Sequence, residues 1–287
     1  MVSVSKEYNF TSNWLDVEGQ RMHYLDEGEG HPVLMLHGNP TWSFYYRNLV
    51  SRLSKKFRCI VPDHIGCGYS DKPQDYSYNL KTHIENCDYL LKALDISRID
   101  LIVHDWGGAI GMGVAVKDPS RINKITIMNS AAFRSDSIPV RIAICRVPVL
   151  GDIIVRRFNL FLGAARYMGT SRPGGLEKPV WKGYLKPYKN YNSRIAIHRF
   201  IKDIPLSPSD SSYSLLKEIE EKLKSLSGKP VLFAWGCKDF CFTDKFLDRW
   251  LDFFPNGKAV RFPEASHFVL EDNEEVVGLI ESFLENE

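Results

Sequence analysis

The stretch IDLIVHDWGG, residues 99–108, decides the fold because an apolar run ends within it and two glycines follow directly. A short, nearly continuous apolar run is typical of a strand buried on both faces of a parallel sheet. Small residues after such a strand let the following helix approach closely, while the central residue of the turn sits on a strained backbone. That central residue is Asp105. The pattern predicts a strand, a sharp turn that presents a carboxylate, and a helix.

Comparable patterns extend outward from this unit in both directions. Residues 15–28 alternate apolar and polar side chains, which favours an antiparallel hairpin at the edge of a sheet. Segments with helical spacing lie between the buried runs, so we predict an α/β fold with a doubly wound, mostly parallel sheet of eight strands. The remaining buried runs are residues 32–38, 57–63, 124–130, 230–236 and 258–265, and the helical segments are residues 41–53, 79–94, 107–116, 245–253 and 271–284.

This alternation is interrupted once. Residues 131–213 contain helix-like and Pro/Gly-rich pieces but no strand of comparable strength. We therefore predict a core formed by residues 1–130 and 214–287, with residues 131–213 inserted as a mainly helical cap.

Composition excludes several classes of function. The chain has 287 residues, and its 37 basic and 35 acidic side chains give a net charge of +2 without a long run of like charges. We therefore expect small uncharged molecules as partners and do not expect nucleic acids. The sequence lacks the apolar core of a signal peptide and any apolar run long enough for a transmembrane segment, so we predict a cytoplasmic protein. Six scattered cysteines show no zinc-ligand spacing, and no metal or cofactor is predicted.

Asp105 is the predicted nucleophile. Serine normally occupies this position in a G-x-S-x-G motif, and that motif is absent from the chain. A carboxylate instead attacks carbon to form an ester, which requires a substrate with a C–halogen bond, an epoxide or a strained lactone. The simpler alternative is an aspartate that only caps a helix.

Anion donors and a base are predicted around this carboxylate. HGNP, residues 37–40, follows a strand where this type of enzyme places its oxyanion loop, so Asn39 and Trp106 would offer backbone and side-chain N–H groups. An asparagine turn and a core tryptophan are the structural alternative. His267 follows a late strand as the predicted base, and Asp239 would orient it. The other candidates for that acid are Asp244, Glu264 and Asp272.

In this arrangement the chain resembles haloalkane dehalogenases of the α/β-hydrolase superfamily. The matching motifs are HGNPTWSFYYRNL (residues 37–49), DHIGCGYSDKP (63–73), HDWGG, and the late Asp and His. One dehalogenase subfamily has a Glu at the position of Asn129, so the resemblance assigns the acid to Asp239.

The cap and C-terminal region resemble the β-lactone decarboxylase (OleB) family of long-chain olefin biosynthesis. The matching stretches are NSAAF (residues 129–133), FNLFLG (158–163), KPYKNYNSRIAIHRFIKDIPLSPSD (186–210) and WGCKDFCFTDKFLDRW (235–250). The resemblance implies decarboxylation of a cis-β-lactone to a cis-alkene, by attack at the carbonyl or at the β-carbon. Other enzymes of the olefin pathway would be its partners.

Three further functions stay open. Haloalkane hydrolysis is the main alternative, and a non-catalytic ligand receptor is another. An epoxide hydrolase would use two cap tyrosines, for which the cap offers Tyr167, Tyr184, Tyr188 and Tyr191. Arginines that interrupt the apolar start of the cap indicate either a solvated helix face or a surface for lipid or a partner; these are Arg141, Arg146, Arg156 and Arg157.

Overall fold

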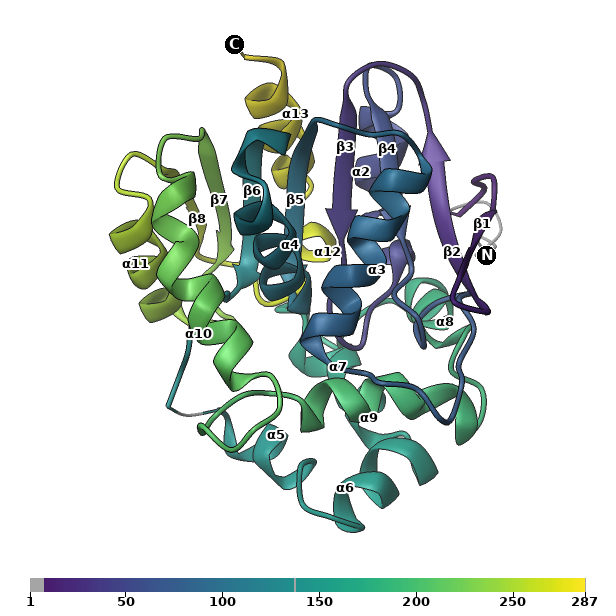
Figure 1. Ribbon diagram of the computed structural model, residues 1–287. Helices are drawn as coiled ribbons and strands as arrows, with labels where there is room; N and C mark the ends of the chain where they lie inside the picture. Colours follow the sequence, from purple (N-terminus) through teal and green to yellow (C-terminus); the bar gives the residue numbers. More distant parts are fainter. Residues whose placement is uncertain (1–7, 137, 287) are drawn as a thin grey trace.

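A single eight-stranded sheet organises the computed structural model, which describes residues 8–136 and 138–286 (Figure 1). Its strand order is β1-β2-β4-β3-β5-β6-β7-β8; β1 and β2 form the predicted antiparallel hairpin at one edge, β2 is antiparallel to β4, and the remaining neighbours are parallel. The predicted fold class is confirmed. The strands are β1 (Asn13–Val17), β2 (Gln20–Glu27), β3 (Pro32–Leu36), β4 (Arg58–Pro62), β5 (Ile99–Asp105), β6 (Ile122–Ser130), β7 (Val231–Gly236) and β8 (Lys258–Phe262).

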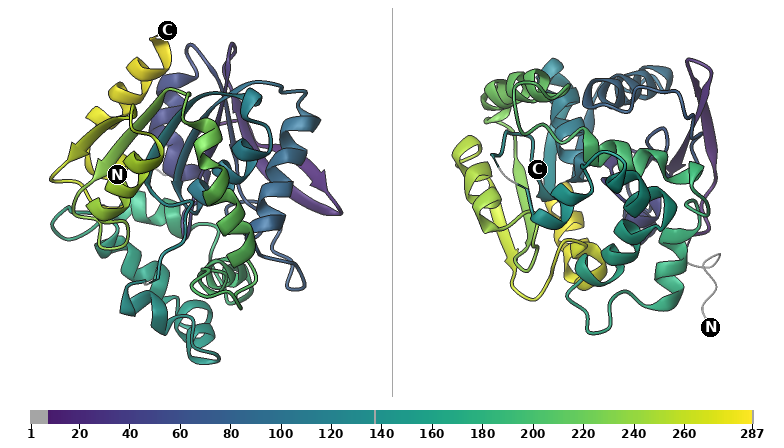
Figure 2. Two further views of the ribbon diagram at one scale, coloured as in Figure 1. Left: turned by 60° about the vertical axis from the view of Figure 1, so that its left-hand side comes forward. Right: turned by 90° about the horizontal axis from the view of Figure 1, so that it is seen from below.

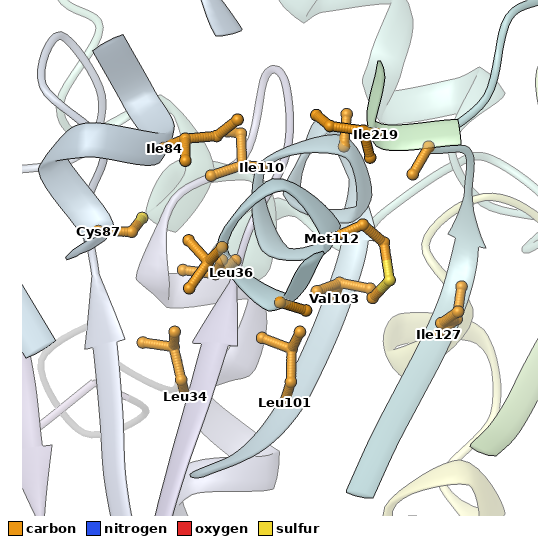
Figure 3. Packing of buried hydrophobic residues seen from close by; sticks show 14 of the residues in the cluster. Leu34, Leu36, Ile84, Cys87, Leu101, Val103, Ile110, Met112, Ile127 and Ile219 are labelled. Carbon is orange, nitrogen blue, oxygen red and sulfur yellow. The ribbon is translucent and has the colours of Figure 1, made fainter. Parts of the chain in front are cut away.

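Helices cover both faces of the sheet because the central strands carry apolar side chains on alternating sides. Leu34 and Leu36 pack towards α3 (Leu80–Ala93), α4 (Trp106–Lys117), α10 (Tyr213–Lys222) and α11 (Asp244–Phe253). The intervening Val33 and Met35 pack towards α2 (Arg47–Leu53), α12 (Val269–Asp272) and α13 (Glu275–Glu285). Figure 3 shows α4 against the strands, with Ile84 of α3 and Ile219 of α10 on either side of it.

Two predicted helices are divided by polar contacts that the sequence pattern does not reveal. The helix predicted at residues 41–53 begins as a 3-10 turn, η1 (Ser43–Tyr46), and the N–H of Ser43 donates to the buried Asp63 carboxylate at 2.7 Å. The helix predicted at residues 271–284 is divided into α12 and α13, because Asn273 adopts an extended backbone and its side chain accepts the N–H of Glu275 at 2.8 Å. Two further 3-10 turns are η2 (Pro119–Arg121) and η5 (Leu223–Leu226).

The chain between β6 and α10 folds as short helices beyond the carboxyl ends of the parallel strands (Figures 1 and 2). Its described part contains no strand. Among the described residues, no helix is long and apolar enough to cross a membrane. These elements are α5 (Val140–Ile144), α6 (Leu150–Asp152), η3 (Ile153–Arg157), α7 (Leu160–Met168), α8 (Lys178–Leu185), η4 (Asn192–Arg194) and α9 (Ile195–Lys202).

Candidate active site

Asp105 occupies the sharp turn between β5 and α4. Its φ of +50° and ψ of −126° lie in a region that non-glycine residues rarely adopt. The neighbours are small because the turn is crowded: a Cβ on Gly107 would lie 1.9 Å from the carbonyl oxygen of Leu36, and one on Gly38 would lie 2.0 Å from the Asp105 carboxylate. The fold thus holds a carboxylate in a strained conformation at the end of the central strand, an arrangement typical of functional sites.

Backbone N–H groups bind this carboxylate. The Asn39 N–H donates to Oδ1 at 2.6 Å, and the Trp106 N–H also hydrogen-bonds the group. Burial raises the pKa of Asp105 above its ordinary value, while His267 and these two N–H groups oppose the rise. Oδ1 is therefore held by the Asn39 N–H, and Oδ2 faces the histidine.

His267 stands between two carboxylates. Its Nδ1 lies 2.8 Å from Asp239 Oδ2, and its Nε2 lies 3.8 Å from Asp105 Oδ2. Burial lowers the pKa of His267, but Asp239 and Asp105 raise it by more, so the net shift is upward. The structure brings these three predicted site residues together.

The other candidate acids lie elsewhere. Asp272 accepts the N–H groups of Ser171 and Ser266, at 3.0 and 2.7 Å, and so ties the histidine loop to the segment after α7. Glu264 pairs with Lys238 at the surface. Asp244 lies at the start of α11, and among the described carboxylates only Asp239 and Asp105 contact His267.

Asn129 is a site residue that our sequence reasoning did not assign a role. Its amide nitrogen donates to Asp239 Oδ2 at 3.1 Å and to the Gly236 carbonyl at 2.9 Å, while its oxygen accepts the Gly236 N–H at 2.8 Å. The Cys241 N–H holds the other Asp239 oxygen at 2.7 Å. Asn129 thereby ties the end of β6 to the turn that carries Asp239. The available signals were its position at the end of a buried strand and the acid that one dehalogenase subfamily has at this position.

An apolar cavity of about 330 Å³ opens above these groups. Asp105, Trp106, Asn39 and His267 form its polar end, and the rest of its wall is mostly hydrocarbon. No group of three or more His, Cys, Asp or Glu side chains among the described residues is placed to hold a metal. The apolar part of the wall includes Leu80, Ala109, Phe133, Ile138, Ile142, Ile154, Phe161, Ala165, Ile201, Leu206, Phe242 and Phe268.

A family model described as the alpha/beta hydrolase fold matches residues 31–274. The chain belongs to the α/β-hydrolase fold family. It is 43% identical to cis-3-alkyl-4-alkyloxetan-2-one decarboxylases from Shewanella oneidensis, over 96% of this chain and 88% of that protein, and from Xanthomonas campestris, over 97% of each. It is 32% identical to haloalkane dehalogenase 2 of Mycobacterium bovis, over 92% of this chain and 91% of that protein.

Structural similarity agrees with this assignment. The crystal structure of haloalkane dehalogenase DatA from Agrobacterium tumefaciens C58 matches with a TM-score of 0.86 at 27% identity, covering 98% of both chains. The chain is thus a haloalkane dehalogenase-like enzyme of the α/β-hydrolase fold family. Its predicted family and enzyme class are confirmed.

The two predicted anion donors, Asn39 and Trp106, also make contacts within the protein. The Asn39 amide nitrogen donates to the carbonyl of Ile197, in α9, at 3.1 Å. An amide nitrogen carries two hydrogens, so one remains to meet an anion in the cavity. The Trp106 ring packs on Phe200 with centroids 5.3 Å apart, which fixes its orientation at the cavity wall.

The tyrosines considered for an epoxide hydrolase are engaged or exposed. Tyr184 donates to Glu271 at 2.5 Å, Tyr188 donates to the Thr41 carbonyl at 3.2 Å, and Tyr191 donates to Asp152 at 2.8 Å. Tyr167 is 57% exposed. None of the four lines the cavity beside Asp105. This arrangement does not favour epoxide opening.

Proposed function

We propose that this enzyme decarboxylates long-chain cis-3,4-dialkyl oxetan-2-ones, which are β-lactones, to cis-alkenes. Its greater identity to decarboxylases than to dehalogenases, over nearly the whole chain, carries the proposal. The site supports it, because a carboxylate nucleophile faces an apolar cavity suited to alkyl chains. Asp105 is the proposed nucleophile. Asn39 and Trp106 are the proposed hydrogen-bond donors to the leaving anion, and His267 is the proposed base, oriented by Asp239.

The reaction converts a lactone into an alkene and CO₂ without consuming water. If Asp105 Oδ2 attacks the β-carbon, the ring C–O bond breaks and the departing carboxylate is stabilised by Asn39 and Trp106. Loss of CO₂ then passes the C–C bonding electrons into the new double bond while the ester C–O bond breaks and Asp105 is regenerated. Inversion at the β-carbon followed by anti elimination gives the cis-alkene from the cis-lactone.

Attack at the carbonyl is the second route. It forms a mixed anhydride with Asp105 and leaves an alkoxide on the β-carbon, which then attacks the Asp105 carboxyl carbon and displaces the substrate carboxylate. Both routes lead to an Asp105 ester at the β-carbon, but β-carbon attack inverts that carbon and carbonyl attack keeps its configuration, so the second route needs a syn elimination to give the cis-alkene. They also differ in the fate of the ring oxygen. A single turnover of lactone labelled with oxygen-18 in the ring distinguishes them: carbonyl attack leaves the label on the Asp105 peptide, and β-carbon attack releases it in CO₂.

Haloalkane hydrolysis is the second candidate function, favoured by the fold similarity to the dehalogenase DatA. In that reaction Asp105 displaces halide, and His267 removes a proton from the water that cleaves the resulting ester. The Asn39 and Trp106 backbone N–H groups at the Asp105 carboxylate would stabilise the oxyanion formed in this step.

The deciding experiment supplies the purified enzyme with a long-chain cis-β-lactone and, separately, with a panel of bromo- and iodoalkanes. Alkene and halide release are measured, with Asp105→Ala as the inactive control. We expect alkene from the lactone and only trace halide. Halide release without alkene would overturn the proposal in favour of dehalogenation, and release of neither would contradict both.

We further propose that residues 131–213 act as a cap that selects the alkyl chains, since helices of this segment supply much of the cavity wall. The expected partners are enzymes that make the lactone, and the expected compartment is the cytoplasm. Exchange of this segment with that of a dehalogenase tests the cap: substrate preference is expected to follow the exchanged segment.

A further inference from the structure

Exposed apolar side chains concentrate on one face of the molecule, formed by α5, α6, η3 and the start of α7. We call this face, within residues 140–167, the apolar tip. Val140 is 75% exposed, Val149 is 72% and Phe158 is 64%, and Val147, Leu150 and Leu160 are also exposed. Figure 1 places α5 and α6 at the end of the molecule farthest from the C-terminus. So many adjacent exposed apolar residues indicate a surface that is covered in use.

The apolar tip is also strained where it is most exposed. Val149 has a φ of +64°, a conformation that is a true outlier for a β-branched residue. The valine side chain lies largely in solvent, so core packing does not account for it. An exposed, strained valine is better explained by contact with something outside the protein.

The charge of this face is strongly positive. Residues 140–167 contain five arginines and one acid, Asp152, which pairs with Arg156 at 3.2 Å. Arg146 pairs with Asp210 outside the segment. Within the described chain, Arg157 is exposed and has no carboxylate within 4.0 Å. Arg141 and Arg166 also lack a carboxylate partner among the described residues, but Arg141 contacts the Phe240 ring at the cavity wall and Arg166 donates to the Leu176 carbonyl. An apolar face with an excess of arginines over acids matches a surface that is apolar inside and negative outside.

The apolar tip is continuous with the cavity. Ile142 of α5, Ile154 of η3 and Phe161 of α7 come from the same short elements and line the cavity. Leu160 of α7 is both exposed and part of the cavity wall, so the exposed face adjoins the substrate space. A hydrophobic molecule dissolved in whatever covers this face would have a short path to Asp105.

We propose that the apolar tip docks on the surface of a lipid bilayer containing anionic lipids. Val149 and Leu150 enter the interface between headgroups and acyl chains, while Arg157 contacts the headgroups. A second copy of this chain is a poorer occupant, because a symmetric contact would bring the same arginines together. The proposal concerns where the enzyme binds and holds for either candidate substrate.

Cosedimentation with vesicles tests the proposal, using phosphatidylcholine alone or mixed with phosphatidylglycerol in equal amounts. The tip variant is Val149→Asn with Leu150→Ser, because asparagine tolerates positive φ and the variant should fold at least as well. The charge variant is Arg157→Glu. The matched controls are Tyr89→Ser, which removes an exposed aromatic on α3, and Lys224→Glu in η5.

We expect the wild-type enzyme to bind the anionic vesicles more tightly than the neutral ones, and less tightly at high salt. The tip variant should bind at least about tenfold more weakly, and Arg157→Glu about fivefold more weakly. Both controls should match the wild type. Turnover of a short, water-soluble substrate should be unchanged in the tip variant, which separates failed docking from failed chemistry.

Three results would overturn the proposal. The first is no binding of the wild-type enzyme to anionic vesicles at low salt. The second is equal binding by the tip variant and the wild type. The third is a dimer in solution that the tip variant converts to a monomer, which would assign the face to a second copy. Folding of each variant is checked by thermal unfolding.

Discussion

Two buried histidine–aspartate pairs of nearly identical geometry occupy different parts of this molecule. His23 Nδ1 lies 2.8 Å from Asp63 Oδ2, and His267 Nδ1 lies 2.8 Å from Asp239 Oδ2. In the first pair the second ring nitrogen is bound by Ser12 Oγ at 3.0 Å. In the second pair it faces Asp105 and the cavity.

Asp63 and Asp239 differ in the other groups that donate hydrogen bonds to them. Asp63 accepts the N–H groups of Ser43 and Tyr69, at 2.7 and 2.8 Å, so it fixes the start of η1 behind the donor loop. Asp239 is held by Asn129 and by the Cys241 N–H. The comparison teaches that the His–Asp contact alone does not make a catalytic group: the free nitrogen must face a reacting atom. We assign the first pair to stability and the second to chemistry.

The largest contrast is expected when each region loses its key carboxylate. Asp105→Ala should reduce turnover by at least about 10⁴-fold, because the nucleophile is gone, without loss of thermal stability. Asp63→Asn should instead destabilise the fold by about 3 kcal/mol, because it breaks a fully buried pair. Turnover per folded molecule should remain near the wild-type value. Thermal unfolding and active-site-normalised rates check both; a stable Asp63→Asn variant would contradict the assignment.

The acid of the catalytic pair comes next. Asp239→Asn should lower turnover about 100-fold, because Asp239 stabilises the charged form of His267, and that charge favours the ionised form of the Asp105 nucleophile. The variant should remain folded, since asparagine fills the same space and can still meet Asn129 and Cys241. If the rate constant of Asp239→Asn matches that of the wild type, the Asp239–His267 pair does not support the reaction at Asp105.

Acidification should abolish activity at Asp105 before it removes the stability that Asp63 provides. His23 and backbone donors lower the pKa of Asp63 to about 2 against the opposing effect of burial, so this residue adds stability above its ordinary value of 3.8 and loses it as the pH falls toward 2. Burial raises the pKa of Asp105, and attack requires its ionised form. Activity should therefore fall, by about tenfold per pH unit, while ellipticity is still native. Coincident loss of activity and structure would contradict this order.

The smallest expected effects come from supporting polar groups. Asn129→Ala should reduce turnover by about tenfold with a modest loss of stability, because Asp239 loses one donor and the turn after β7 is released. The matched change near the other pair is Ser70→Ala, since Ser70 Oγ bonds the His23 N–H and the Asp63 carbonyl. It should cost about 1 kcal/mol without changing turnover. If both changes lowered the rate equally, the assignment of the His23–Asp63 pair to stability and the His267–Asp239 pair to chemistry would be wrong.

Much of the fold and the core of the site were predictable from local pattern. β5 has the predicted bounds because every residue in it is buried and the glycines mark its end. Asp239 and His267 were predictable because each follows a strand, and carboxyl ends of parallel strands meet at one edge of a sheet.

Contacts between distant segments were not predictable. Asn129 meets Gly236 and Asp239 across more than a hundred residues, and no periodicity encodes such a contact. The Asn39 amide donates to Ile197 of a later helix for the same reason. The sequence also placed apolar residues at 140–167 without indicating whether they pack inside or face outward, since short helices with mixed arginines fit either arrangement.

The most direct test of the central claim, that Asp105 attacks carbon, is mass spectrometry of the His267→Gln variant after incubation with the β-lactone and, separately, with a long-chain bromoalkane. Removal of the base should leave the ester intermediate uncleaved with the bromoalkane. We predict a substrate-derived mass on the peptide that contains Asp105 with at least one of the two substrates, and no such mass in the double variant with Asp105→Ala. An unmodified Asp105 peptide with both substrates, or a mass located on another residue, would contradict the account.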